Sequence, residues 1–101
     1  MEIRKTQVFA DWLDGLRDLH GRARIQARIE RMATGNFGDV APVGQGVSEM
    51  RIHLGPGYRV YFKQSGRLLI VLLAGSDKDS QAKTIKMART MAINLQGEDD
   101  E

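Results

Sequence analysis

Apolar side chains recur every three or four residues in two segments near the N-terminus, a spacing typical of helices that bury one face. Thr6 precedes the first segment and suits the position of a helix N-cap. The second segment spans about residues 22–33, and Gly35 follows it as a stop signal. The inward residues predicted for the two helices are Val8, Phe9, Trp12, Leu13, Leu16, Ile25, Ile29 and Met32.

Strand patterns, short and rich in apolar residues, occupy four further segments, over residues 2–6, 47–54, 58–64 and 67–75. The segment from residue 35 to 46 holds four glycines and a proline and is predicted as a loop. A last helix is predicted over residues 80–95. The order β-α-α-β-β-β-α predicts one α+β domain over residues 1–96 with an antiparallel sheet. Residues 97–101 are predicted as an acidic, disordered tail.

The turn at residues 55–57 sets the predicted pairing of the two central strands. If these residues form a three-residue loop, Leu54 faces Tyr58 across the hairpin. The face directed to the core then carries Met50, Ile52, Leu54, Tyr58, Val60 and Phe62. The opposite face pairs Glu49 with Lys63, Arg51 with Tyr61, and His53 with Arg59. A slip of one residue would mix polar and apolar side chains on both faces, so we expect one polar patch.

The strand predicted over residues 67–75 indicates that the polar patch is covered by another element. Reading residues 65–66 as a two-residue turn sends alternate residues of the next strand to opposite faces. The core face receives Leu69, Val71 and Leu73, and the patch side receives Leu68, Ile70 and Leu72. Exposed aliphatic residues need a cover, and the last helix follows directly, so we expect the patch to form one wall of a groove. Lys78 and Lys83, at the start of that helix, are expected near its rim.

Composition narrows the class of protein. With 101 residues the chain can bury a modest core, and its lack of cysteine excludes disulfides and thiolate chemistry. The longest apolar run, residues 68–74, is too short to cross a bilayer, and the first residues contain no run typical of a signal peptide. We therefore expect a cytoplasmic protein without a membrane segment.

The formal net charge of +2 is unevenly distributed along the chain. The last five residues contain four of the 13 acidic side chains, which leaves nine acids against 15 Lys and Arg in residues 1–97. A basic body favours an anionic partner, with nucleic acid as the first candidate. Many small basic domains bind nothing of this kind, so the charge alone leaves the question open.

The expected patch has the chemistry for cleaving RNA, in which a 2′-hydroxyl attacks the neighbouring phosphate. Arginine side chains bind phosphate oxygens through two hydrogen bonds and stay charged. His53 is the candidate general base, because imidazole titrates near neutral pH, and Tyr58 or Tyr61 is a candidate to stack on a base. A plainer interpretation stays open, in which these side chains only form the solvated face of a hairpin. We expect no metal or other cofactor, because His20 and His53 lie far apart and no carboxylate cluster accompanies them.

Three pieces of the chain, in the order VFADWLDGL, GVSEMRIHLGPGYRVYF and LLIVLLAGSDKDSQAKTIKMA, resemble small toxins of the RelE/ParE superfamily. The HigB-like branch, known as addiction-module killer proteins, is the most similar, and the resemblance spans nearly all of residues 1–96. Its most specific parts are the E-x-R-I-x…G-P-G-Y-R-V-Y-F hairpin and the G-x-D-K-x-x-Q-x-x-x-I-x-x-A run.

The resemblance implies a helical pair on one face of the sheet and a basic, RNA-binding groove on the other. It implies the toxin of a type II toxin–antitoxin module, a metal-independent endoribonuclease that cuts mRNA on the ribosome. The implied partners are the ribosome, mRNA and a helix-turn-helix antitoxin, and operator DNA is met only through the antitoxin. Together with the patch chemistry it nominates Arg51, His53, Arg59 and Tyr61 as catalytic, and Lys63, Lys78, Lys83 and Tyr58 as RNA or phosphate contacts.

The resemblance has a gap, since several relatives complete the reaction with a tyrosine, or a histidine and an aspartate, near the C-terminus. This chain has no tyrosine after Tyr61 and no histidine after His53, so the general acid stays open. Two other functions stay open as well, a ParE-like inhibitor of DNA gyrase and a non-catalytic module kept for antitoxin binding and operon control. The pairing of His53 with Arg59 favours cleavage, because a mere binder needs no titratable group at the patch.

Overall fold

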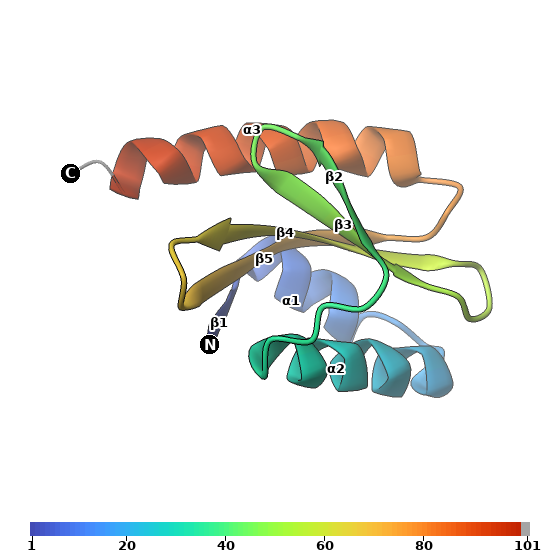
Figure 1. Ribbon diagram of the computed structural model, residues 1–101. Coiled ribbons are helices and arrows are strands. Elements are labelled where there is room, and N and C mark those ends of the chain that lie inside the picture. The colour runs from blue at the N-terminus through green and yellow to red at the C-terminus, as the bar shows by residue number, and fades with distance from the viewer. Residues whose placement is uncertain (100–101) are drawn as a thin grey trace.

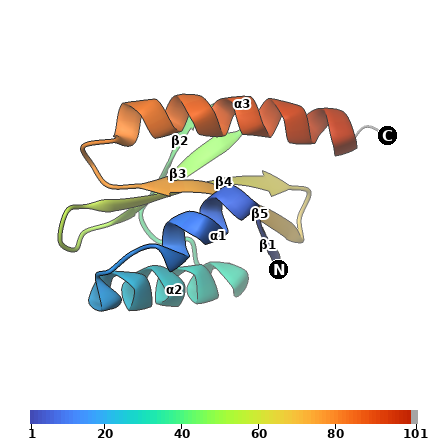
Figure 2. The same ribbon diagram turned by 180° about the vertical axis from the view of Figure 1, so that it is seen from behind.

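The computed structural model describes residues 1–99, with side chains as far as Leu95, and has an α+β fold (Figure 1). Its elements are β1 (Glu2–Lys5), α1 (Gln7–Asp14), α2 (Leu19–Ala33), β2 (Val40–Gly44), β3 (Val47–Ile52), β4 (Tyr58–Ser65), β5 (Leu69–Ser76) and α3 (Gln81–Asp99). The sheet is the middle layer, with α1 and α2 on one face and α3 along the other, as the reverse view also shows (Figure 2). The predicted α+β class is confirmed.

The helices begin and end at residues with suitable chemistry. The hydroxyl of Thr6 accepts a hydrogen bond from the Phe9 N–H, which confirms the predicted N-cap of α1. Helix α2 starts earlier than predicted, because Asp18 caps it by accepting from the Gly21 N–H. Gly35 follows the end of α2 with a φ of 96°, a conformation that favours glycine. Helix α3 extends past the predicted end at Leu95 and includes residues 97–99 of the predicted tail, whereas residues 100–101 lie outside the described residues.

The sheet has five strands in the order β1-β5-β4-β3-β2, and it is mixed. The strand β1 pairs in parallel with β5, and the other pairs are antiparallel, so the prediction of an antiparallel sheet holds for four strands. The strand β2 lies in the segment predicted as a loop, at the edge of the sheet where its Pro42 is tolerated. Pro42 within this strand and the glycines on both sides of it obscure the strand pattern in the sequence.

The β3–β4 hairpin has the predicted faces but a different register. Arg51 is the partner of Arg59, and Ile52 is the partner of Tyr58, so the connection is a five-residue loop, residues 53–57. The predicted pairing is therefore wrong by two residues. A shift of two keeps every side chain on its face, and the face predicted to carry Glu49, Arg51, Arg59 and Tyr61 does carry them.

The side chains of β5 point to the opposite faces of the sheet from those predicted. Its turn has three residues, 66–68, instead of two, and an odd difference exchanges the two faces. Ile70 and Leu72 therefore pack toward α1 and α2, whereas Leu73 packs toward α3. A bulge follows, since Tyr61 pairs with Ala74 and Phe62 with Leu72, which leaves Leu73 as the extra residue. The prediction that the last helix covers the face of the sheet opposite the helical pair is nevertheless confirmed.

Two apolar clusters, one on each face of the sheet, form the core. The larger lies beneath α1 and α2 and includes the predicted inward residues Phe9, Leu13, Ile25, Ile29 and Met32. The smaller lies beneath α3 and consists of Val47, Tyr61, Leu73, Ala88 and Ala92. Val8 is the exception among the residues predicted to point inward, since it is 43% exposed. Within the described part of the chain, none of the helices combines the length and apolar character needed to span a membrane.

Candidate functional site

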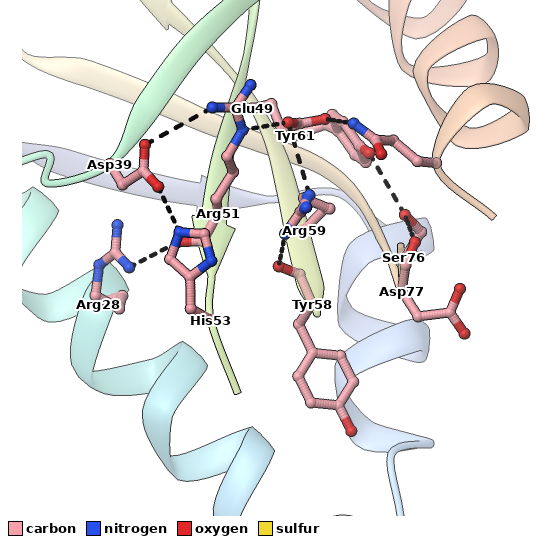
Figure 3. A network of polar contacts seen from close by, with 11 residues as sticks. Arg28, Asp39, Glu49, Arg51, His53, Tyr58, Arg59, Tyr61, Ser76 and Asp77 are labelled. Carbon is pink, nitrogen blue, oxygen red and sulfur yellow. Dashed lines mark hydrogen bonds and ion pairs between the residues drawn. The ribbon is translucent and has the colours of Figure 1, made fainter. Parts of the chain in front are cut away.

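A fully buried carboxylate lies at the centre of the polar face, beneath the start of α3 (Figure 3). Glu49 is 0% exposed, and its Oε1 atom is 2.9 Å from Nε of Arg51 and 3.7 Å from Nε of Arg59. Gln81, the first residue of α3, donates a hydrogen bond of 2.7 Å to Oε2 of the same carboxylate. Burying a carboxylate is costly unless it is paired, and here two guanidinium groups and an amide surround it.

Arg51 is held from three directions. Its Nε atom donates to Glu49, and this hydrogen bond raises the pKa of the Arg51 guanidinium. Its NH1 atom is 3.9 Å from a carboxylate oxygen of Asp39. Its backbone carbonyl accepts a hydrogen bond of 2.8 Å from the Arg28 guanidinium, which reaches across from α2. The Arg51 side chain is therefore fixed in place while remaining partly exposed.

Arg59 is buried but incompletely hydrogen-bonded. Its side chain is 9% exposed, and its Nε atom has no hydrogen-bond partner among the described residues. The NH1 group donates a long hydrogen bond of 3.4 Å to the backbone carbonyl of Tyr58. A buried donor without a hydrogen-bond partner is unusual, and the carboxylate of Glu49, 3.7 Å away, is the acceptor paired with this Nε atom.

Tyr61 lies on the predicted face but is inaccessible. It is fully buried under α3, and its hydroxyl oxygen is 3.5 Å from Oγ of Ser76. Burial raises the pKa of Tyr61 to about 12. The prediction that Tyr61 is exposed in the groove is wrong, because α3 covers this position. The alternation of residues along a strand cannot reveal such a cover.

His53 forms a hydrogen-bonded contact that the sequence analysis did not identify. Its Nε2 atom lies 2.6 Å from Oδ2 of Asp39, and the imidazole is 71% exposed. The hydrogen bond from His53 is the main cause of the lowered pKa of Asp39. Asp39 immediately precedes β2, and its carbonyl accepts a hydrogen bond from the Arg51 N–H. Recognising β2 as an edge strand paired with β3 would have located Asp39 beside this site.

Three of the nominated residues line one cavity of about 540 Å³. They are His53 directly after β3, Arg59 on β4, and Lys78 in the segment before α3. The turn of residues 55–57 forms the rest of the lining with Asp79, and the Lys78 N–H donates to the Pro56 carbonyl at 3.3 Å. The cavity is therefore lined by an arginine, a lysine and a histidine together with one aspartate.

The other nominated residues lie elsewhere. Lys83 lines a separate cavity of about 330 Å³ beside Trp12. Lys63 lines a cleft with Arg4 and Lys5, which belong to β1 at the edge of the sheet. Tyr58 faces the helical pair, where it is 5% exposed and donates a hydrogen bond of 2.8 Å to Asp18. Burial on the core face contradicts its nomination as a base-stacking residue. No three His, Asp or Glu side chains gather into a metal-binding group in the part of the chain that is described.

The fold and the cavity define an α+β protein with a basic site at one end of its sheet. The chain belongs to the same family as an uncharacterized protein of Haemophilus influenzae, to which it is 45% identical over 95 residues. The alignment covers 94% of this chain and 96% of that protein. No family model matches the sequence.

Proposed function

We propose that this protein is the toxin of a toxin–antitoxin module and cleaves mRNA on the ribosome, with a fold of the RelE/ParE type and its HigB-like branch. The observation that carries the proposal is the shared cavity of His53, Arg59 and Lys78. Arginine and lysine suit the negatively charged phosphate of RNA, and histidine supplies a group that transfers protons at neutral pH. The resemblance of the sequence to the RelE/ParE superfamily supports the same interpretation.

In the proposed reaction, the RNA 2′-oxygen forms a bond to the adjacent phosphorus, and the bond from phosphorus to the 5′-oxygen breaks. His53 accepts the proton of the 2′-hydroxyl, and Asp39 orients the imidazole. If Nε2 carries the proton donated to Asp39, Nδ1 is left free to act as the base. Arg59 stabilises the charge that develops on the phosphate oxygens. Lys78 protonates the departing 5′-oxygen, which leaves a 2′,3′-cyclic phosphate and a 5′-hydroxyl.

The proposed partners follow from this assignment. The ribosome would present the message to the cavity, and a helix-turn-helix antitoxin would bind the toxin and connect it to operator DNA. The proposed site of action is the cytoplasm, where the ribosome and message meet.

The test is to induce the protein in bacterial cells and to map RNA ends across the transcriptome. We expect growth arrest and new 5′-hydroxyl ends inside translated reading frames. A purified system with ribosomes should reproduce the cuts, and naked RNA should be cut much more slowly. Arrested cells with intact messages would refute the proposal.

The burial of Tyr61 supports a second candidate, in which the fold binds its target without cutting it. One of the four nominated catalytic side chains is unavailable, and a ParE-like inhibitor of DNA gyrase needs none of them. A supercoiling assay with purified gyrase separates the two candidates. Inhibition without RNA damage would favour the binder, and harmless overexpression would favour a module kept for operon control.

A further inference from the structure

Glu49 and Gln81 are polar residues of this site to which the proposed reaction assigns no step. Each belongs to one of the two most specific sequence motifs, and the fold brings them into direct contact across 32 positions of sequence. Glu49 is fully buried, and Gln81 is partly buried at the start of α3. A buried carboxylate with an assigned donor for each oxygen is a built arrangement, so its role needs an explanation.

The two oxygens of Glu49 have separate partners. Oε2 accepts from the Gln81 amide, whereas Oε1 faces the Nε atoms of Arg51 and Arg59 at 2.9 and 3.7 Å. The Gln81 hydrogen bond thereby fixes the rotation of the carboxylate and directs Oε1 toward the arginines. Without it, the carboxylate would turn about its last bond to find another donor.

The charges explain why a carboxylate is needed at this position. Arg51 and Arg59 are directly opposite each other in the β3–β4 ladder, a placement that destabilises a pair of like charges. Glu49 lies on the same face, two residues before Arg51, and compensates one of the two positive charges. The three side chains together keep a net charge of +1, and Asp39, 3.9 Å from Arg51, adds a further negative charge on the Arg51 side of the cluster.

Gln81 also connects two parts of the cavity. Lys78 lies three residues before Gln81, whereas Arg59 lies on the strand beneath α3. The hydrogen bond from Gln81 to Glu49 ties the start of α3 to the strands, and so keeps Lys78 in register with Arg59.

We propose that Glu49 and Gln81 are positioning residues, in which Glu49 orients the guanidinium groups of Arg51 and Arg59 and Gln81 locks the carboxylate that does so. The positioning itself is a property of the free protein, and its effect on cleavage rests on the proposed function above.

The test variant is Gln81→Met, which keeps the length of the side chain and removes the donor. Gln7→Met is the matched control, because Gln7 also donates a hydrogen bond of 2.7 Å to a carboxylate, that of Asp11, on the exposed face of α1. Glu49→Gln removes the charge with little change in shape, but it leaves the arginines uncompensated and risks unfolding. The Gln81→Met variant therefore keeps the test decisive.

The first measurement is the NMR signal and hydrogen exchange of the arginine Nε–H groups in the free protein. In Gln81→Met we expect exchange at Arg51 to accelerate by about tenfold, with a backbone spectrum that is otherwise unchanged, since a hydrogen bond to a charged group has roughly this effect. The Gln7→Met control should match the wild type at these signals. Unchanged exchange at Arg51 and Arg59 in Gln81→Met would overturn the proposal.

The second measurement is the cleavage rate in the ribosome-containing assay. At a temperature where the variant is fully folded, we expect Gln81→Met to cleave about tenfold more slowly, because misplaced arginines stabilise the developing charge less well. If the wild type cleaves nothing, the proposed function fails, while the arginine signals still decide the positioning. If the wild type cleaves and Gln81→Met keeps both its rate and its signals, the positioning role fails alone.

Discussion

His53 and Asp39 form a contact of 2.6 Å although they lie 14 residues apart and neither belongs to a strand. The contact is possible because β2 pairs with β3, which brings the residue before β2 alongside the residue after β3. An exposed imidazole of this kind has many rotamers, and a carboxylate partner restricts them. The pair therefore gives His53 one orientation at the edge of the cavity.

Substitution of this pair tests the proposed base. We expect His53→Ala to slow RNA cleavage by about a hundredfold or more, as for loss of a general base. Asp39→Asn should cause a smaller loss, about tenfold, because the base remains but is less well oriented. The measurement is the cleavage rate with ribosomes, and the control is His20→Ala, which alters an exposed histidine of α2. Cleavage by His53→Ala at the wild-type rate would exclude His53 as the base.

Arg59 and Lys63 lie on the same strand and carry the same charge, but only Arg59 lines the cavity. Arg59→Ala should reduce cleavage by about a hundredfold, a loss typical of removing one donor to a developing oxyanion. Lys63→Ala should retain wild-type cleavage, because its cleft lies beside β1 at the edge of the sheet. Circular dichroism checks that both variants fold. Equal losses in the two variants would mean that general basic charge, and not this cavity, binds the RNA.

Tyr58 is predicted to stabilise the fold without serving the reaction. Tyr58→Phe removes the hydrogen bond to Asp18 and should lower the melting temperature by about 5 °C. The pKa of Asp18 is lowered first by the Gly21 N–H and then by the Tyr58 hydroxyl. A lowered carboxyl pKa contributes stability above the unfolded value, about 3.9, which is lost as the pH falls through the folded value. The difference between wild type and Tyr58→Phe should therefore shrink below about pH 4, while cleavage near neutral pH stays equal.

The two tyrosines are also predicted to resist ionisation. Burial raises the pKa of Tyr61 to about 12, and burial with the Asp18 hydrogen bond raises that of Tyr58. A raised phenol pKa contributes stability that is complete below the unfolded value, about 10, and is lost as the pH rises toward the folded value. Alkaline titration should show little tyrosinate absorbance at pH 10, followed by coupled ionisation and unfolding at higher pH. Half-ionisation of both rings near pH 10 in the folded protein would contradict the buried position of Tyr61.

The bulge in β5 makes a prediction about packing. After the extra residue Leu73, Gly75 lies opposite Val60 and faces α1, where a Cβ atom would overlap the indole of Trp12. Gly75→Ala should destabilise the fold by about 1–3 kcal/mol, as for other overpacked sites. Chemical denaturation measures this change. Combining Gly75→Ala with Trp12→Leu should cost less than the sum of the single changes, because the smaller side chain makes room.

The side-chain faces of the central hairpin could be predicted from the sequence because the error in its register was an even number of residues. The true loop is two residues longer than predicted, and a shift of two preserves both faces, so Glu49, Arg51 and Arg59 were placed correctly. The turn before β5 differs by an odd number, and Ile70 and Leu72 were therefore assigned to the wrong face. Loop length is set by local geometry at Gly66, whose φ of 67° cannot be read from alternation.

The rest of the site depends on tertiary contacts. Asp39 escaped notice because the glycine- and proline-rich segment around β2 resembles a loop and gave no register. The enclosure of Tyr61 depends on the path of α3, which strand periodicity does not contain. The same helix brings Gln81 to Glu49, so the buried centre of the site became visible only with the fold.

The parallel pairing of β1 with β5 has a consequence for how the chain folds during its synthesis. Glu2 finds its partner Leu69 only after 67 further residues have been made, and α3 follows later still. A chain growing from its N-terminus carries Arg51 and Arg59 well before it carries Lys78 or Gln81. Folding dominated by such distant pairings is slow to begin and late to finish. A chain that ends before Lys78 therefore lacks part of the cavity lining.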